Sequence, residues 1–489
     1  MNAVNFKCVS LTALFVGAGM LANVVGATAA DLGGNCCADL EERVAELEAT
    51  TARKGNRKVS LQVYGQVSEA IMWWNDGGES NTFVLENHDT KNRLGFQGSA
   101  KINSDWSAGY KIEVQVRAYR SSSYNQLSLG ASNNVQIPTY NTQSISLREA
   151  NWYIKSNTYG TISVGRQGEA TNSIDLINLA NPDGFGGHGY SAGRAHQGLF
   201  LRRSGTTGNT GLSALNWNAA FHRNNSNSAD YVYASDFSGV KYASPFFLGQ
   251  TKSTGFQVQG SWGMDDATSV ALRYAETFGA FKIAAGIGYS SWSNPDMLQC
   301  SNLGGAANVS LVSAVDCSSI AGSASIMHSP TGLYVSGGAG QLKDNNRNLL
   351  TNNLAAGLST KIKDTDSSWW IQGGWVAKLN SFGATTFWGN YASFTSYGNI
   401  ANQTIASIGA NDVLNSFAGV ATVNMQKAQS NTISVGITQD IDAAAMKLYM
   451  GYIISSTDLT LVNRANLQTQ KSNAVEDVGV FFTGATIKF

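Results

Sequence analysis

Apolar and polar side chains alternate along most of the chain from Val59 onward. Leu61 and Val63 flank Gln62, for example, and Val67 follows Gln66. A period of two is typical of β-strands, because successive side chains point to opposite faces of the sheet. We therefore predict an all-β fold over residues 59–489. The same pattern recurs at residues 110–117, 215–221, 256–262, 270–274, 281–287 and 433–437.

The number of these strands favours a transmembrane antiparallel β-barrel over a soluble exported sandwich, which is the alternative. In such a barrel the apolar side chains face lipid and the polar ones face the lumen. Aromatic pairs such as Trp73-Trp74 and Trp369-Trp370 are typical of the girdles at membrane interfaces. We predict sixteen strands, with eighteen as the alternative. A barrel of this size encloses an aqueous channel.

The first residues have the features of a secretion signal. Lys7 precedes a mostly apolar stretch over residues 9–25, and Ala27-Thr28-Ala29 has the small-x-small pattern of a cleavage site. We predict a signal peptide over residues 1–29 and a periplasmic N-terminal extension over residues 30–58. Within this extension, residues 38–49 carry apolar residues at coiled-coil spacing. They predict a short helix, either a trimeric coiled coil or a solvated tether.

The composition argues against several functional classes. Charged residues are 13% of the chain, about half the share of a soluble domain, and the formal net charge is zero. Nothing therefore indicates a nucleic acid as partner. The histidines are scattered, and no hydrolase elbow, zinc-protease or phosphate-loop spacing occurs. We expect no enzymatic activity, metal or cofactor, with a Ser-His barrel hydrolase as the catalytic alternative.

The cysteines agree with an oxidising compartment. Cys300 and Cys317 flank a loop of small residues and are candidates for a disulfide. Cys36 and Cys37 are adjacent, which strains a bond between them. For these two we expect bonds between subunits or free thiols.

Strand alternation also assigns charged side chains to the lumen. If Leu94 and Phe96 face lipid, Arg93 faces the lumen. A charge on the lipid face costs roughly 2–4 kcal/mol near the midplane, which supports this assignment. The same argument places five more residues in the lumen: Lys111, Glu113, Arg117, Arg202 and Arg273.

Residues 167–196 form a long loop after a predicted strand. The loop carries Glu169, Asp175 and Asp183. Long loops with their own content are usually functional. Folded into the barrel, this loop would set its acids against the arginines of the wall, and charges so arranged tune ion selectivity.

Three motifs resemble the trimeric general porins. Arg93-Leu94-Gly95-Phe96-Gln97-Gly98 is similar to the second strand of enterobacterial porins, whose arginine projects into the constriction. The stretch from Arg148 to Arg166 is similar to their fourth and fifth strands, where the leading arginine also lies on the constriction wall. Pro182-Asp183-Gly184-Phe185-Gly186-Gly187 is similar to the tip of their inward-folded third loop, with one extra glycine. Together with the alternation and the loop acids, this predicts a pore constriction of Arg93, Arg148, Arg202, Arg194, Glu169, Asp175 and Asp183.

Both ends of the chain resemble porins as well. Residues 35–42 and 57–61 are similar to porins of alphaproteobacteria, which implies a homotrimer in the outer membrane of a Gram-negative bacterium. It also implies attachment to peptidoglycan through the mature N-terminus, where the Ala30 amine is the candidate nucleophile. The final strand ends in Phe489, similar to the signal that the barrel-insertion machinery recognises.

These observations predict a water-filled passive diffusion channel for small hydrophilic solutes and ions. Two alternatives remain open: a solute-specific channel, and a structural tether between the outer membrane and peptidoglycan.

Overall fold

The computed structural model describes most of the chain after residue 57. The described residues are 58–116, 121, 124–127, 145–182, 185, 191–217, 237–263, 266–293, 316–345, 347, 357–397, 400–401, 404–405, 407–417, 419–420 and 423–489. Several predictions fall outside them: the signal peptide, the coiled-coil segment, Ala30, Cys36, Cys37, Arg117, Asp183 and Cys300.

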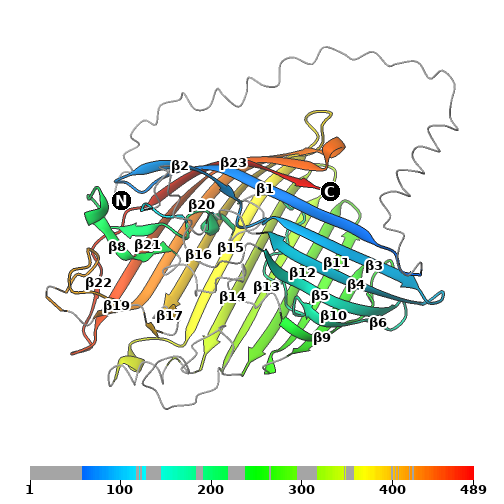
Figure 1. The fold of residues 1–489 in the computed structure, drawn as a ribbon, viewed down its shortest axis with the longest axis horizontal. Coiled ribbons are helices and arrows are strands. Elements are labelled where there is room, and N and C mark those ends of the chain that lie inside the picture. The colour runs from blue at the N-terminus through cyan, green and yellow to red at the C-terminus, as the bar shows by residue number, and fades with distance from the viewer. Residues whose placement is uncertain are drawn as a thin grey trace, which may run out of the picture. The chain divides into compact units, whose positions relative to one another are not determined.

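Antiparallel strands close into one 16-stranded β-barrel. Figure 1 shows how the strands lie side by side around it. Each barrel strand pairs with the barrel strands before and after it, and β23 closes the ring on β1, where Phe481 lies opposite Trp73. The all-β barrel and the number of strands predicted from the sequence are therefore confirmed. The barrel strands are β1 (Gln62–Asn75), β3 (Arg93–Lys101), β4 (Trp106–Val116), β5 (Ile145–Ser156), β6 (Gly160–Gln167), β9 (Phe237–Ala243), β10 (Gly255–Gly263), β11 (Thr268–Phe278), β12 (Phe281–Trp292), β13 (Cys317–His328), β14 (Leu333–Asp344), β15 (Thr365–Ala377), β16 (Thr385–Tyr397), β20 (Val423–Ile441), β21 (Met446–Asn463) and β23 (Val478–Lys488).

The second barrel strand is interrupted. β2 (Ser80–Glu86) pairs with the C-terminal half of β1, and β3 pairs with its N-terminal half. Residues 87–92 connect the two pieces. The remaining short elements are β7 (Phe200–Arg202), β8 (Leu212–Asn216), β17 (Ile400–Ala401), β18 (Thr404–Ile405), β19 (Ser407–Ile408), β22 (Thr469–Lys471) and the 3-10 helices η4 (Ser191–Ala195), η5 (Asn209–Gly211), η8 (Leu358–Thr360) and η9 (Asp442–Ala444).

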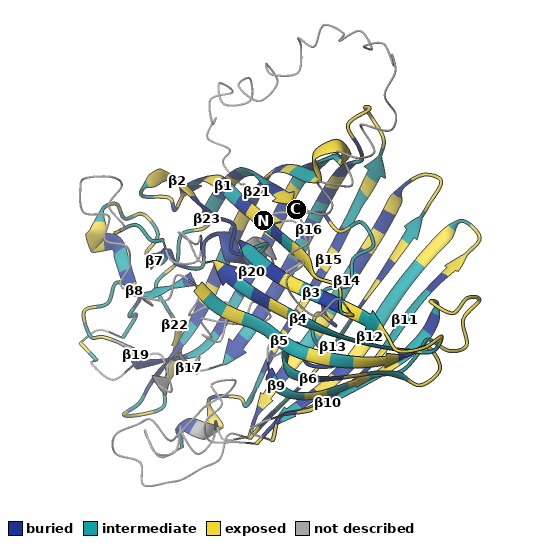
Figure 2. Cartoon of the chain, turned by 45° about the vertical axis from the view of Figure 1, so that its right-hand side comes forward, coloured by how far each residue is buried: buried dark blue, intermediate teal, exposed yellow. Residues whose placement is uncertain are grey.

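The outer face of the barrel is apolar and uncovered. Ile71, Val270 and Ile371 are each about half exposed, whereas the residues that flank them on their strands are mostly buried or polar. Figure 2 shows the resulting alternation of buried and exposed positions along the strands. Alternation with the apolar side outward is the reverse of a soluble sandwich. In the described part of the chain, no helix has the length and hydropathy needed to cross a membrane.

One sector of the barrel interior is apolar rather than polar. Met72, Trp74 and Phe482 are buried there together with Leu201 and Trp217, which belong to the connection between β6 and β9. The prediction that polar side chains line the whole lumen is wrong in this sector. The reason is that a chain segment packs inside the barrel and needs an apolar surface to bury.

The hairpin of β7 and β8 is part of this inner segment. The two strands pair only with each other, and Phe200 lies opposite Asn216. We predicted a barrel strand at residues 215–221, and for Leu215 and Asn216 this is wrong. A hairpin with one face on an apolar core shows the same alternation as a barrel strand.

Candidate pore constriction

A segment that follows β6 crosses the inside of the barrel. Residues 168–182, here called the inner loop, contact the inward faces of successive strands from β9 to β15 and then of β21. Phe185 continues this path to β23, where its ring packs edge-on against Phe482 at 5.1 Å between centroids. The described residues 168–182 and Phe185 of the long loop predicted at residues 167–196 therefore lie within the barrel.

Serine and threonine side chains of the wall hold the inner loop. Ser323 Oγ donates to Ile174 O at 2.7 Å and accepts from the Ile177 amide at 2.9 Å. Small hydroxyl side chains suit this position because they satisfy backbone groups that the loop would otherwise bury without partners. Further hydroxyl bonds join Ala170 N to Ser261 and Ser269, Thr171 to Ser290, Leu179 N to Ser325 and Asn178 to Ser336. Other wall side chains also bond to the loop: Gln372 to Asn178, Trp370 to Asp175 O, Lys241 to Gly168 O and Lys447 to Asn181 O.

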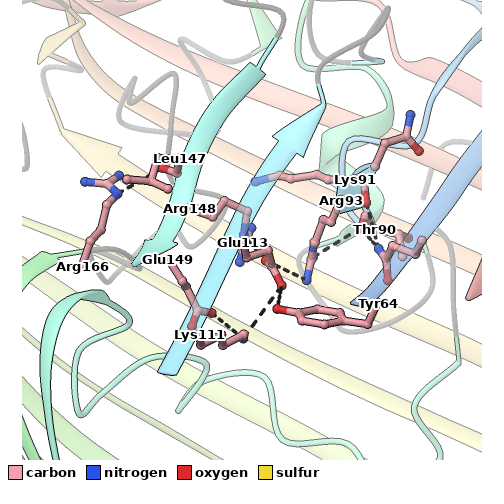
Figure 3. Close-up of polar contacts among 12 residues, drawn as sticks. Tyr64, Thr90, Lys91, Arg93, Lys111, Glu113, Leu147, Arg148, Glu149 and Arg166 are labelled. Atoms are coloured by element: carbon pink, nitrogen blue, oxygen red, sulfur yellow. Dashed lines mark hydrogen bonds and ion pairs between the residues drawn. The ribbon is translucent and has the colours of Figure 1, made fainter. Parts of the chain in front are cut away.

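Charged side chains gather on the inner wall at β3, β4 and β5, with Tyr64 of β1 beside them. Figure 3 shows this Glu113 cluster, which consists of Tyr64, Arg93, Lys111, Glu113, Arg148 and Glu149. The Glu113 carboxylate accepts from Arg148 Nε at 2.8 Å and from the Tyr64 hydroxyl at 3.0 Å. Arg93 and Lys111 lie 4.0 and 3.8 Å from it, and Lys111 also pairs with Glu149 at 2.9 Å. The structure thus brings the predicted Arg93, Arg148, Lys111 and Glu113 together.

A β-bulge places two neighbouring charges of β5 on the same side of the sheet. Glu113 lies opposite Glu149, but the next residue of β4, Val114, lies opposite Leu147, so Arg148 is the extra residue. Strict alternation would direct Arg148 and Glu149 to opposite faces. The extra residue bends the strand and redirects side chains locally. As a result, Arg148 reaches Glu113 while Glu149 reaches Lys111.

The described acids of the inner loop face the wall, not the Glu113 cluster. Glu169 is 2% exposed, and it accepts from Trp292 Nε1 at 3.2 Å and from Ser290 Oγ at 3.3 Å. Asp175 is fully buried. The prediction that Glu169 opposes the arginines across the channel is therefore wrong, and Asp175 is buried away from the channel surface.

Burial also changes the protonation of Glu169, which lies outside the membrane-spanning strands. Loss of solvation raises the pKa of its carboxyl to about 7, although the hydrogen bonds from Trp292 and Ser290 oppose the shift. A carboxyl without a cation in its surroundings is easier to bury in the neutral form. Near neutral pH, Glu169 is therefore only partly ionised.

Arg202 and Arg194 lie apart from the Glu113 cluster. Arg202 is buried in ion pairs with Asp76 at 3.0 Å and Glu79 at 3.1 Å, both in the turn between β1 and β2. Arg194 is buried against Asp89, which belongs to the link between β2 and β3. The prediction that these two arginines line the constriction is wrong. Instead, Arg202 connects the β7–β8 hairpin to the turn between β1 and β2, and Arg194 connects η4 to the link between β2 and β3.

Arg273 faces inward, as predicted, but its guanidinium is occupied by the inner loop. It donates to the carbonyl oxygens of Asn172 and, at 3.4 Å, of Ala170. Arg273 is therefore a support for the loop and not a free charge of the channel.

The structure describes one of the two cysteines of the predicted disulfide. Cys317 is disulfide-bonded and buried at the start of β13. Cys300 lies outside the described residues, so the pairing of the two cysteines stays a prediction.

The sequence reasoning missed three features of the site: Tyr64, Glu149 and the hydroxyl-bearing wall. Tyr64 has the parity of a lumen-facing residue on β1, so alternation could have identified it. Glu149 has the inward parity set by Trp152 and Ile154, which are exposed on the outer face of β5, so alternation could have identified it too. Serines that alternate with apolar residues, as at residues 319–325, were a signal for a polar wall but not for the loop that it holds.

Comparisons with known proteins give only distant similarities. No known family and no curated protein matches the sequence. Among solved structures, a loop-deletion mutant of OmpT, an outer membrane protein of Vibrio cholerae, is 12% identical with a TM-score of 0.48, covering 88% of this chain and 100% of its own. OmpF of Salmonella typhi, solved in complex with daunomycin, is 13% identical with a TM-score of 0.46, covering 88% and 98%. The outer membrane channel DcaP of Acinetobacter baumannii is 12% identical with a TM-score of 0.42, covering 90% and 100%. Membership of the alphaproteobacterial porins stays a prediction.

Proposed function

We propose that this protein is an outer-membrane channel that lets small hydrophilic solutes and ions diffuse passively. The observation that carries the proposal is the closed barrel with an exposed apolar outer face and an inner loop facing a charged wall. A barrel whose outer residues are apolar is at its most stable in lipid, where its backbone groups are already paired. Solutes that cross it must pass the Glu113 cluster.

The chemistry of this passage supports a channel for polar solutes. Arg93, Lys111 and Arg148 carry positive charge, and Glu113 and Glu149 carry negative charge, within one hydrogen-bonded group. Such a wall offers donors and acceptors to water and to polar solutes. Rings of charged side chains tune the ion selectivity of pores.

The predicted homotrimer, the Gram-negative outer membrane and the recognition of the last strand by the insertion machinery belong to the same proposal. In its support, β23 pairs with both β1 and β21, and the backbone of Phe489 bonds to that of Gly65 at 2.9 and 3.1 Å. A terminal strand that closes the ring is a suitable element for a machinery that completes barrels. The attachment to peptidoglycan through Ala30 rests on the sequence alone.

Planar-bilayer recording of the purified, folded protein tests the proposal. We expect ohmic conductance that appears in steps of three. We also expect liposomes containing the protein to swell at rates that fall with solute size. Saturation with one class of solute would support a solute-specific channel, and folded protein without any conductance would refute the channel.

A further inference from the structure

The outer face of the barrel has an apolar groove near its short turns. The groove has a volume of about 690 Å³ and lies across β12 to β16. Phe281, His328 and Leu333 line it and are the strand-end residues next to the turns. The groove is shallow and open along the outer face.

Two glycines form the floor of the groove. Gly373 of β15 and Gly389 of β16 lie directly opposite each other. A Cβ atom added to Gly373 would come no closer than 3.8 Å to any other atom, and one added to Gly389 no closer than 3.9 Å. By contrast, a Cβ on the adjacent Gly374 would lie 2.1 Å from Phe387 O. The fold therefore requires glycine at Gly374 but not at Gly373 or Gly389.

Glycine without an internal reason is unfavourable in a strand, because it costs roughly 0.5–1 kcal/mol relative to alanine. Glycines inside strands often mark a place where another molecule approaches the backbone closely. A facing pair of such glycines on the outer surface indicates an external occupant.

The walls of the groove define the chemistry of this occupant. Trp375 and Phe387 stack at 5.9 Å between ring centroids and are both partly exposed. The Trp375 indole donates to Thr331 O at 2.7 Å, so its polar atom is directed to the turn and its ring to the groove. His328 Nδ1 lies 2.8 Å from Thr331 Oγ1 at the same rim. The groove is thus apolar inside and polar only at the end next to the turns.

We propose that this groove holds one acyl chain of a phospholipid from the leaflet beside the short turns. This inference rests on the proposed membrane location. The groove is continuous with the exposed apolar face, and its polar rim lies at the height where lipid headgroups meet aromatic girdles. A second copy of the chain fits less well, because a stable subunit contact buries about 800 Å² on each partner and not one narrow groove.

Photolabelling of the reconstituted full-length protein tests the proposal. Phosphatidylcholine vesicles would contain a small fraction of phosphatidylcholine with a diazirine in one acyl chain, and labelled peptides would be mapped by mass spectrometry. We expect labelling to concentrate on residues 326–335 and 373–389. The double variant Gly373→Leu, Gly389→Leu fills the floor, and we expect about tenfold less labelling there, because leucine side chains occupy the space of the chain.

Gly260→Leu is the matched control. Gly260 lies on the outer face of β10, away from the groove, and a Cβ there would meet only Ser269 O at 3.9 Å. Labelling of the groove should be the same in this variant as in the wild type. Both leucine variants should conduct like the wild type, which shows that they fold and insert.

Three results would overturn the groove site. The first is labelling spread evenly over all lipid-facing strands, and the second is groove labelling that the double variant leaves unchanged. The third is protection of the groove from lipid together with crosslinks between subunits through a Gly389→Cys variant, which would assign it to a subunit interface. The channel proposal fails separately, if the wild type inserts and is labelled but does not conduct.

Discussion

Arg148 Nε lies 2.8 Å from Glu113 Oε1, and this contact exists because Arg148 is the extra residue of a β-bulge. The bulge lets β5 present a cation and an anion side by side to β4. Glu113 is the common acceptor of the cluster, since Tyr64, Arg93, Lys111 and Arg148 all surround it. Glu113 therefore makes the largest number of polar contacts within the cluster, and Glu149 supplies its second negative charge.

Replacing Glu113 should change the ion preference of the channel. Glu113→Gln removes one negative charge and leaves the three cations of the cluster in place. The interaction energy between a unit charge and an ion 4 Å away is about 1 kcal/mol in water and about 4 kcal/mol near a protein surface. We expect the reversal potential in a KCl gradient to move toward chloride. The control Glu149→Gln removes the carboxylate that pairs with Lys111. This variant should move the reversal potential less than Glu113→Gln does. A shift of the reversal potential toward potassium in Glu113→Gln would contradict the assignment of Glu113 to the channel wall.

Removing the arginines should have the opposite effect. In the double variant Arg93→Ala, Arg148→Ala the wall loses two long side chains and two positive charges, so we expect a larger single-channel conductance and a shift toward potassium. Arg203→Ala removes an exposed arginine next to the β7–β8 hairpin and serves as the control. Equal conductance in the wild type and the double variant would mean that the narrowest part of the channel lies elsewhere.

Ser323 should be a main anchor of the inner loop. Ser323→Ala leaves the Ile177 amide and the Ile174 carbonyl without their partner, which costs roughly 1–3 kcal/mol for buried groups. We expect faster hydrogen exchange at the Ile177 amide and larger fluctuations of the open-channel current. Ser318→Ala changes a serine of opposite parity on the same strand and should alter neither. Unchanged exchange in Ser323→Ala would show that the loop is held mainly by its other contacts.

The attachment of the inner loop should weaken as the pH rises. The pKa of Glu169 is about 7 in the folded chain and 4.5 ordinarily. Between these values the folded chain binds a proton that the unfolded chain has lost, so the stability due to this group falls with increasing pH. The change between pH 5 and pH 8 is on the order of 2 kcal/mol.

Thermal unfolding at several pH values measures this effect. The wild type should lose stability from pH 5 to pH 8, and Glu169→Gln should show a smaller dependence, because its side chain stays neutral. Asp105→Asn is the control: hydrogen bonds from Ser156 and Thr158 lower the pKa of Asp105, which lies in a turn outside the membrane-spanning strands, so it does not titrate in this window. The same pH dependence in Glu169→Gln and in the wild type would contradict the role of Glu169.

The sequence by itself determined the barrel. Alternation such as that of Leu61, Gln62 and Val63 sets the parity of each strand, because a strand offers a side chain only two directions. Parity alone correctly placed Arg93, Lys111 and Glu113 on one wall. The length of the segment after β6 and its place between two strands were also sufficient to predict a loop with a role inside the barrel.

Only the tertiary structure decided where the charges of that loop point. Glu169 and Asp175 lie in a segment without a repeating backbone, so no periodicity fixes their direction; both are buried, and Glu169 bonds to Ser290 and Trp292 of the wall. Arg202 and Arg194 pair with acids more than a hundred residues away in the sequence, which no local pattern encodes. The bulge at Arg148 is likewise a property of two paired strands. A parity rule holds along one strand, whereas bulges, ion pairs and loop contacts depend on which segments meet in space.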